Sequence, residues 1–216
     1  MEIDPETLTI SERSKLLVGA IVPRPIALVS TVAPDGSSTN LAPYSFYNGV
    51  GTNPMTLLYC PANKADGTEK DSLRNCKPRE EGGQGEFVVS VVSEAIAARM
   101  AASAADLPYG ESEFVFAGLT PAASVRVRPP RVLESLVAFE CETLMVVRTG
   151  PAGGAHAGNV VIGRVVSVHV ADAVLRERMR IDPDALGAVG RMAGETYART
   201  RDRFDLPRGK AVPGPR

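Results

Sequence analysis

The sequence predicts a mainly β protein, folded as a predominantly antiparallel barrel with peripheral helices. Three observations support this prediction. Short apolar and β-branched runs follow one another and are joined by short loops. Glycine and proline are frequent, with 20 and 17 among 216 residues, which suits a chain with many turns. Only two or three helices are interspersed, whereas a doubly wound parallel sheet needs a helix after most of its strands.

The chain begins with a short predicted helix at residues 11–18, with Ser11 as the candidate N-cap. The segment Pro23-Arg24-Pro25 stops this helix, because proline lacks the backbone N–H, clashes with the preceding helical turn and disfavours helical backbone at the residue before it. A β-branched strand then covers residues 26–32. The dipeptide Asp35-Gly36 predicts a hairpin turn, and the returning strand covers residues 39–43.

Two further strands are predicted at residues 45–50 and 55–60. The chain is then polar and loop-like up to residue 69, and a short helix follows at residues 70–77. After a glycine-rich break, residues 86–92 form a clear strand of β-branched and aromatic residues.

An alanine-rich helix is predicted at residues 93–105, with Ser93 at its cap, and a mixed loop follows at residues 106–124. Two long strands cover residues 132–148 and 159–170. The glycine-rich segment 150–158 joins them.

We expect one domain over residues 1–216, with the barrel core at residues 20–170. Residues 171–216 are expected to form a helical, arginine-rich extension. From Arg176 to the end, ten basic residues stand against six acidic ones, a local charge of +4.

The composition excludes several classes of function. The whole chain carries 24 basic and 25 acidic residues, so neither nucleic acid nor an anionic membrane is expected as the main partner. No stretch approaches the ~20 apolar residues that span a bilayer. The acidic amino terminus has no apolar run behind it, so no secretory signal is expected. Three cysteines without C-x-x-C spacing suggest neither a disulfide framework nor a zinc site, and a cytoplasmic location is the expectation.

Side chains typical of covalent or metal catalysis are scarce. The glycine cluster at residues 82–85 matches neither the dinucleotide fingerprint nor the P-loop, and we interpret it as a loop. His156 in a glycine-rich loop and His169 at a strand end have no third ligand at metal spacing, so no metal site is predicted. Cys60 borders the polar loop and is a weak nucleophile candidate. No serine has a G-x-S-x-G setting, so a hydrolase is not indicated.

The polar residues between positions 30 and 72 form the main candidate site. Ser30, Thr31, Asn40 and Ser45 lie on the first strands and turns, and Lys70-Asp71-Ser72 opens the short helix. A helix start with a lysine and a hydroxyl can hold a phosphate through free N–H groups and positive charge. The simpler alternative, in which Asp71 or Ser72 is only a cap and Lys70 is solvated, stays open.

Five segments, in this order, resemble the flavin reductase-like family, the FMN-binding split-barrel group that includes flavoredoxin-like and DIM6/NTAB-type proteins. They are residues 23–32 (PRPIALVSTV), 40–46 (NLAPYSF), 53–54 (NP), 70–75 (KDSLRN) and 85–89 (GEFVV). The resemblance covers about residues 20–170 and extends into the tail at residues 190–199 (GRMAGETYAR).

The resemblance implies a split β-barrel that binds FMN near a homodimer interface. It assigns to the isoalloxazine and ribityl chain the residues Asn40, Leu41, Ala42, Pro43, Tyr44, Ser45 and Phe46, largely through backbone groups. It sets Thr31 on the facing strand, Lys70, Asp71 and Ser72 by the phosphate, and Arg191 over the ring. Many relatives have Lys-Asp-Thr where this chain has Lys-Asp-Ser, and serine keeps the hydroxyl.

The implied activity is hydride transfer from NADH or NADPH to FMN, as a flavin reductase or as the reductase component of a two-component monooxygenase. A flavin carries the redox step itself, so no catalytic side chain is expected. The first alternative is an FMN-binding electron-transfer protein without NAD(P)H activity. The second is a barrel that binds another ligand, such as haem or pyridoxal phosphate. The electron acceptor and the preferred nicotinamide nucleotide are not determined by the sequence.

Overall fold

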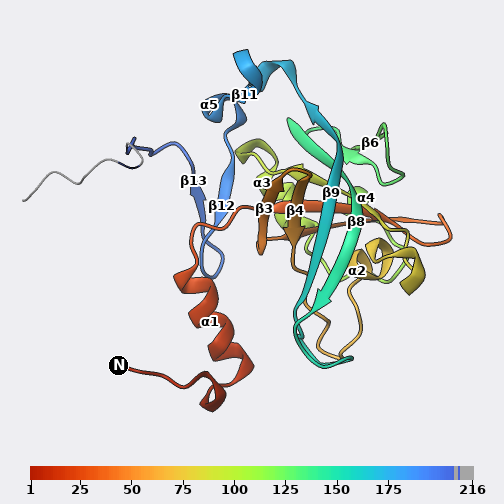
Figure 1. Cartoon of the computed structure of the whole chain (residues 1–216), viewed down its shortest axis with the longest axis vertical. Helices are drawn as coiled ribbons and strands as arrows, with labels where there is room; N and C mark the ends of the chain where they lie inside the picture. Colours follow the sequence, from red (N-terminus) through yellow and green to blue (C-terminus); the bar gives the residue numbers. More distant parts are fainter. Residues whose placement is uncertain (207–208, 210–216) are drawn as a thin grey trace, which may run out of the picture.

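The computed structural model describes residues 1–206 and residue 209. One seven-stranded sheet dominates it, in the order β2-β1-β5-β8-β9-β4-β3, and every neighbouring pair is antiparallel. Its long strands β8 and β9 lie side by side in Figure 1. The strands are β1 (Ala27–Val32), β2 (Thr39–Tyr44), β3 (Tyr47–Thr52), β4 (Met55–Tyr59), β5 (Glu86–Val91), β8 (Val137–Arg148) and β9 (Asn159–Val170). The mainly β, antiparallel prediction is confirmed.

The two edge strands of this sheet, β2 and β3, are consecutive in the chain. Only Ser45 and Phe46 lie between them, so the end of β2 and the start of β3 are at most about 11 Å apart. The sheet therefore curls until its edges meet, yet β2 and β3 do not pair with each other. This is the architecture of a split barrel, and Ser45 lies at its seam.

Strand β1 is buried on both faces, which explains its unbroken apolar sequence. Val29 packs inside the barrel with Tyr59 and Phe87. Leu28 points the other way and packs with Phe114, in a second cluster that the helices cover. The helices on this outer face thus bring residues 97–117 against β1 and β2.

The helices are short and peripheral. They are α1 (Ile10–Ala20), α2 (Asp71–Cys76), α3 (Ala97–Ala102), α4 (Glu113–Ala117) and α5 (Pro183–Leu186), with 3-10 turns η1 (Pro5–Thr7), η2 (Arg79–Glu81), η3 (Glu94–Ile96), η4 (Asp172–Val174) and η5 (Glu177–Met179). Helix α1 projects away from the barrel and buries none of its residues (Figure 1).

Several predicted boundaries shift. The predicted helix at 11–18 is α1, but its N-cap is Thr9, which forms a capping box with Glu12, and not Ser11. The predicted helix at 93–105 divides into η3 and α3, and the Ser93 side chain makes no capping bond. The predicted loop 106–124 contains α4, which the pattern did not reveal because the helix has only five residues.

The predicted strand 132–148 begins as the short strand β7 (Arg131–Val132), and β8 starts only at Val137. Strand β7 pairs with β6 (Pro121–Ala122) in a separate two-stranded sheet.

The carboxy-terminal extension is not helical as expected, within the part of the chain that the structure describes. It forms η4, η5 and two small antiparallel pairs, β10 (Leu175–Arg176) with β11 (Arg180–Ile181) and β12 (Val189–Arg191) with β13 (Tyr197–Arg199). Its one α-helix, α5, starts at Pro183 and stops at Gly187, which has a φ of +53°. Glycines and prolines at short intervals interrupt any longer helix, whatever the arginine content. The expectation for residues 207–208 and 210–216 lies outside the described residues.

Across the described residues, no helix is both long and apolar enough to cross a membrane. The same residues contain no group of three or more His, Cys, Asp or Glu side chains that could hold a metal ion.

Candidate functional site

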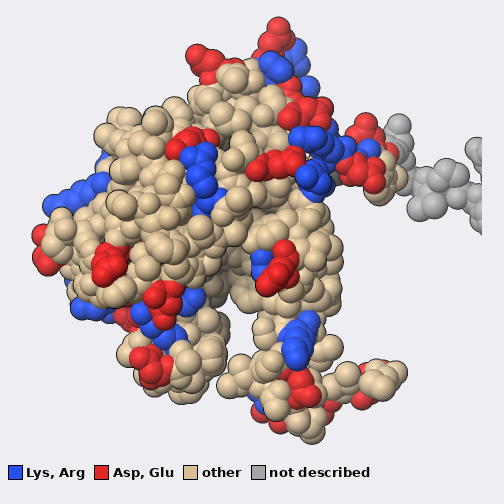
Figure 2. All heavy atoms as spheres, turned by 180° about the vertical axis from the view of Figure 1, so that it is seen from behind, with Lys and Arg blue, Asp and Glu red and all other residues tan. Residues whose placement is uncertain are grey.

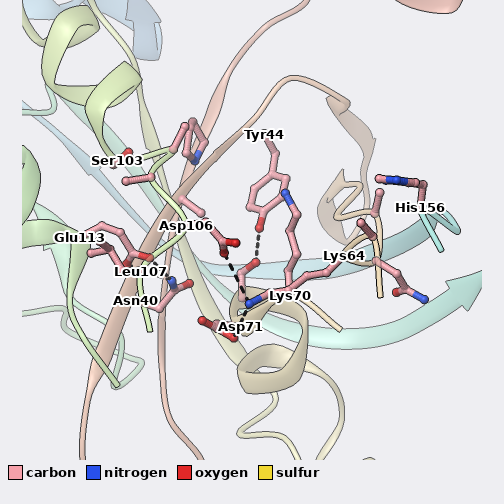
Figure 3. Close-up of a pocket in the computed structure, with 18 residues that line it drawn as sticks. Asn40, Tyr44, Lys64, Lys70, Asp71, Ser103, Asp106, Leu107, Glu113 and His156 are labelled. Carbon is pink, nitrogen blue, oxygen red and sulfur yellow. Dashed lines mark hydrogen bonds and ion pairs between the residues drawn. The ribbon is translucent and has the colours of Figure 1, made fainter. Parts of the chain in front are cut away.

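Two adjoining cavities lie along strand β2. The first has a volume of about 380 Å³ and includes Lys64 and Lys70 in its wall, so we call it the lysine cavity (Figure 3). The second has a volume of about 550 Å³ and includes Arg191, so we call it the arginine cavity. Pro43 and Ala104 line both, so the two cavities form one groove that runs past β2.

The lysine cavity contains charges of both signs. The Lys64 Nζ lies 3.6 Å from an Asp106 oxygen and 3.9 Å from an Asp71 oxygen. Lys70 precedes α2 and is exposed, with its Nζ 5.9 Å from the centre of the Tyr44 ring. Among the described residues Lys70 forms no ion pair. Of the two lysines in this cavity, Lys70 is therefore the one whose charge is available to an anion.

Glu113 is a carboxylate in the wall of the lysine cavity that the sequence analysis missed. Its oxygens accept hydrogen bonds from the Asn40 amide at 3.0 Å and from the Leu41 N–H at 2.8 Å. Burial raises the pKa of Glu113, while the hydrogen bond from Leu41 acts in the opposite direction. Glu113 thus seals part of the open edge of β2, and no motif marks it because its partners are some 70 positions away in the chain.

A buried hydrogen bond joins Tyr44 on β2 to Ser72 on α2. Ser72 is 1% exposed, and burial raises the pKa of Tyr44. Deeper in the barrel, the Tyr59 hydroxyl lies 3.0 Å from the Cys76 Sγ. The Ser72 hydroxyl therefore has a partner within the protein and fixes the first turn of α2 against β2.

The arginine cavity is lined by both apolar and polar side chains. Met100 and Ala101 of α3 are apolar members of this lining, and Ser45 is a polar one. Arg191 of β12 stacks on Tyr197 of β13, with its guanidinium carbon 4.5 Å from the ring centre. The β12–β13 hairpin therefore contributes one cation and one aromatic ring to the wall of this cavity.

Nine of the twelve predicted cofactor residues lie in the groove. Those in the lysine cavity are Asn40, Ala42, Pro43, Tyr44, Lys70, Asp71 and Ser72, and those in the arginine cavity are Pro43, Ser45 and Arg191. Segments far apart in the sequence therefore meet here, as the resemblance implied. Contact of these residues with a cofactor stays a prediction.

The other three predicted residues line neither cavity. Thr31 is fully buried behind β2, where it accepts a hydrogen bond from Asn75 at 3.1 Å. Leu41 points into the outer core. Phe46 lies at the seam and is 37% exposed, with the Arg24 guanidinium 5.9 Å from its ring centre.

The histidine and cysteine candidates differ in their position relative to the two cavities. His156 lines the lysine cavity from the loop between β8 and β9. His169 and Cys60 line neither cavity, and burial raises the pKa of the Cys60 thiol. On the face shown in Figure 2, acidic and basic side chains are interleaved, with no broad basic surface of the kind that binds nucleic acid.

The comparisons with known proteins match flavin reductase-like and related redox proteins. The family model for the flavin reductase like domain matches residues 18–189. Component B of nitrilotriacetate monooxygenase from Bacillus cereus is 37% identical, with a TM-score of 0.87 over 95% of this chain and 98% of its own. The 2-nitrobenzoate 2-nitroreductase NbaA of Pseudomonas fluorescens is 28% identical, with a TM-score of 0.84 over 99% and 98%.

A third structure supports the fold alone. It is a split-barrel protein of the flavin reductase type from Shewanella frigidimarina, 22% identical, with a TM-score of 0.73 over 96% of this chain and 98% of that one. The split barrel inferred from the meeting of β2 and β3 is thus found again in this structure.

Proposed function

The chain belongs to the flavin reductase-like family, and on that premise we propose that it is an FMN-binding oxidoreductase that takes electrons from NADH or NADPH. The electrons pass to free flavin, to a partner monooxygenase or to another redox protein. The groove along β2 carries the proposal, because it offers an available cation at one end and polar donors together with apolar side chains at the other. The likeness to a monooxygenase component B over nearly the whole of both chains supports it.

The residues of the groove fit FMN. Each cavity lies within the roughly 300–1,000 Å³ typical of small-molecule sites, and together they form an elongated space for an elongated ligand. Lys70 has no ion pair among the described residues, so it suits a terminal phosphate. The first N–H groups of α2 lack partners within the helix and lie beside it. Met100 and Ala101 suit the flat face of an aromatic ring system.

When bound, the flavin supplies the two-electron chemistry, and the protein binds and orients it. Lys70 and Asp71 frame the phosphate end. The hydrogen bond between Tyr44 and Ser72 keeps the first turn of α2 against β2 at the phosphate end of the groove. Arg191 and Tyr197 line the arginine cavity as a stacked pair and would lie beside the bound ring system.

The cofactor is tested by loading the purified protein with a mixture of FMN, FAD and riboflavin, releasing the bound ligand by heat and identifying it by chromatography. We expect FMN, because Lys70 suits one terminal phosphate. Recovery of FAD alone, or of no flavin, would contradict the proposal.

The donor is tested by mixing the FMN-loaded protein anaerobically with NADH or NADPH and following the flavin absorbance. Bleaching by either nucleotide supports the reductase. Retention of FMN without bleaching by either one supports the alternative, an FMN-binding electron-transfer protein.

We also propose that the protein is a homodimer. Helix α1 buries none of its residues, and Ile10, Leu16, Leu17 and Ile21 are each about half exposed. A second copy is the simplest cover for these exposed apolar side chains of α1 and its C-cap, since symmetric dimers are the commonest assembly. Light scattering at micromolar concentration is expected to give twice the 22.8 kDa of one chain, and a strict monomer would contradict this.

A further inference from the structure

Arg24 is a buried cation that has no carboxylate partner among the described residues. It is 4% exposed. Its guanidinium donates to the carbonyl oxygens of Val18 at 2.6 Å, Ile21 at 2.8 Å and Met192 at 2.9 Å. Its Nε donates to the Ser45 Oγ at 3.2 Å. All four acceptors are uncharged, so the positive charge is held in place without being neutralised by an acid.

This contact determines what the Ser45 hydroxyl can do. A guanidinium only donates hydrogen bonds, so the Ser45 oxygen accepts from Arg24 and its own proton is left for another acceptor. Ser45 lines the arginine cavity. Its backbone N–H also has no hydrogen-bond partner within the described part of the chain. One residue at the seam of the barrel therefore has two free donors.

The charges near Ser45 are mainly positive. Arg191 lines the same cavity, and its backbone pairs with that of Arg24 through hydrogen bonds of 2.9 and 2.8 Å. Glu195 also lines this cavity but is exposed to solvent, which screens its charge. A ligand that gains negative charge here is favoured over its neutral form.

We propose that Arg24 is a positioning residue that holds Ser45 as a hydrogen-bond donor toward the ring of bound FMN and thereby favours the reduced flavin. The inference rests on the proposed function. Oxidised FMN has a neutral ring, whereas the ring of the reduced form readily carries negative charge on its pyrimidine side. Donors and cations fixed at that side bind the reduced form more tightly, and such differential binding shifts the redox equilibrium.

The test compares the affinity for oxidised FMN and the midpoint potential of bound FMN in Ser45→Ala, Arg24→Lys and the double variant. Ser45→Ala is expected to weaken the binding of reduced FMN about tenfold relative to that of oxidised FMN, which lowers the midpoint potential by about 30 mV. Arg24→Lys keeps the charge but loses the planar fork that fixes Ser45. We therefore expect it to weaken the binding of reduced FMN about threefold, which lowers the midpoint potential by ~15 mV. In the Ser45→Ala background, Arg24→Lys should add almost nothing.

Two controls distinguish a positioning role of Arg24 from a general effect on protein stability. Ser45→Thr keeps a hydroxyl and should retain the wild-type midpoint. Arg13→Lys alters another arginine that donates to backbone carbonyls, on α1 and outside both cavities, and should leave the midpoint unchanged. If Arg24→Lys does not fold, Arg24→Gln replaces it in the same comparison with and without the Ser45 hydroxyl.

The outcomes are distinct. Wild-type protein that binds no FMN overturns the proposed function and this inference with it. Tight FMN binding with equal midpoints in wild type and Ser45→Ala overturns only this inference. If Arg24→Lys lowers the midpoint potential as much in the Ser45→Ala background as in wild type, Arg24 does not act through Ser45. This result also overturns the inference.

Discussion

The two ends of the groove hold their cations in opposite ways. In the lysine cavity, Lys70 is exposed, and Lys64 is opposed by Asp71 and Asp106. Beside the arginine cavity, Arg24 is buried and held only by neutral oxygen atoms. The first arrangement can bind an anion at little expense to the fold. In the second arrangement, the Arg24 guanidinium holds several segments together and also supplies positive electrostatic potential. Substitution of Arg24 should therefore reduce stability, whereas substitution of Lys70 should mainly reduce anion binding.

The largest expected effect is a loss of stability when Arg24 is replaced, compared with replacement of the exposed Lys70. Arg24→Met removes four hydrogen bonds and leaves the carbonyls of Val18, Ile21 and Met192 without this donor, so it should lower the free energy of unfolding by about 3 kcal/mol. Lys70→Met should change it by no more than about 0.5 kcal/mol. Urea denaturation of both variants makes the comparison, and equal losses would refute the distinction between the two ends.

A second prediction tests the phosphate end. Lys70→Ala removes one charge-assisted hydrogen bond to FMN, worth about 1–2 kcal/mol after allowance for exposure, or roughly 5–30-fold in affinity. Riboflavin has no phosphate, so its affinity should hardly change. Titration of both flavins measures the ratio.

The matched control for this titration is Lys15→Ala, which removes an exposed lysine of α1 with the same change in net charge. An unchanged ratio of FMN to riboflavin affinity in Lys70→Ala would mean that the phosphate binds elsewhere.

A third prediction concerns Ser72, whose hydroxyl the resemblance assigns to the phosphate and the structure bonds to Tyr44. Ser72→Ala and Tyr44→Phe each remove one side of this buried bond, and each should cost about 1 kcal/mol of stability. Thermal or urea unfolding measures this.

The flavin ratio then separates the two roles of Ser72. A loss of FMN affinity relative to riboflavin in Ser72→Ala but not in Tyr44→Phe supports a phosphate contact. Equal behaviour of the two variants means that the hydroxyl only secures α2.

The smallest expected effect is a pH dependence at Glu113. Burial raises the pKa of Glu113 in the folded state, so the folded protein binds this proton more tightly than the unfolded chain does. The stability from this group is present below the unfolded pKa of about 4.5 and is lost as the pH rises through the folded pKa. Relative to wild type, Glu113→Gln should therefore lose less stability between pH 4 and 7, by under about 1 kcal/mol.

Unfolding free energies of wild type and Glu113→Gln at several pH values test this difference directly. Parallel curves would show that Glu113 has the same pKa in both states. Glu134 is a suitable control position. Burial acts to raise the pKa of its carboxyl, but hydrogen bonds from Thr120 and the nearby Arg99 together outweigh this and lower it, so Glu134→Gln should change the slope in the opposite direction.

Local sequence was sufficient for the elements that local patterns specify. The hairpin at Asp35-Gly36, the helix that begins after Lys70 and the long pair of strands β8 and β9 all lie close to their predicted positions. Each is determined by turn chemistry, by alternation or by β-branched content within a few residues. Within the described part of the tail, residues 171–206, the predicted helical extension is wrong, because glycines and prolines at short intervals interrupt any longer helix.

The sequence by itself grouped part of the site, since the five segments of the resemblance contribute nine of the 25 residues that line the two cavities. Only the tertiary structure decided how they are used. The closure of β2 against β3 places Ser45 at the seam, the packing of α4 brings Glu113 to the edge of β2, and the docking of β12 buries Arg24. These contacts join residues from about 20 to nearly 170 positions apart, and no local pattern encodes which backbone oxygens a buried guanidinium will meet.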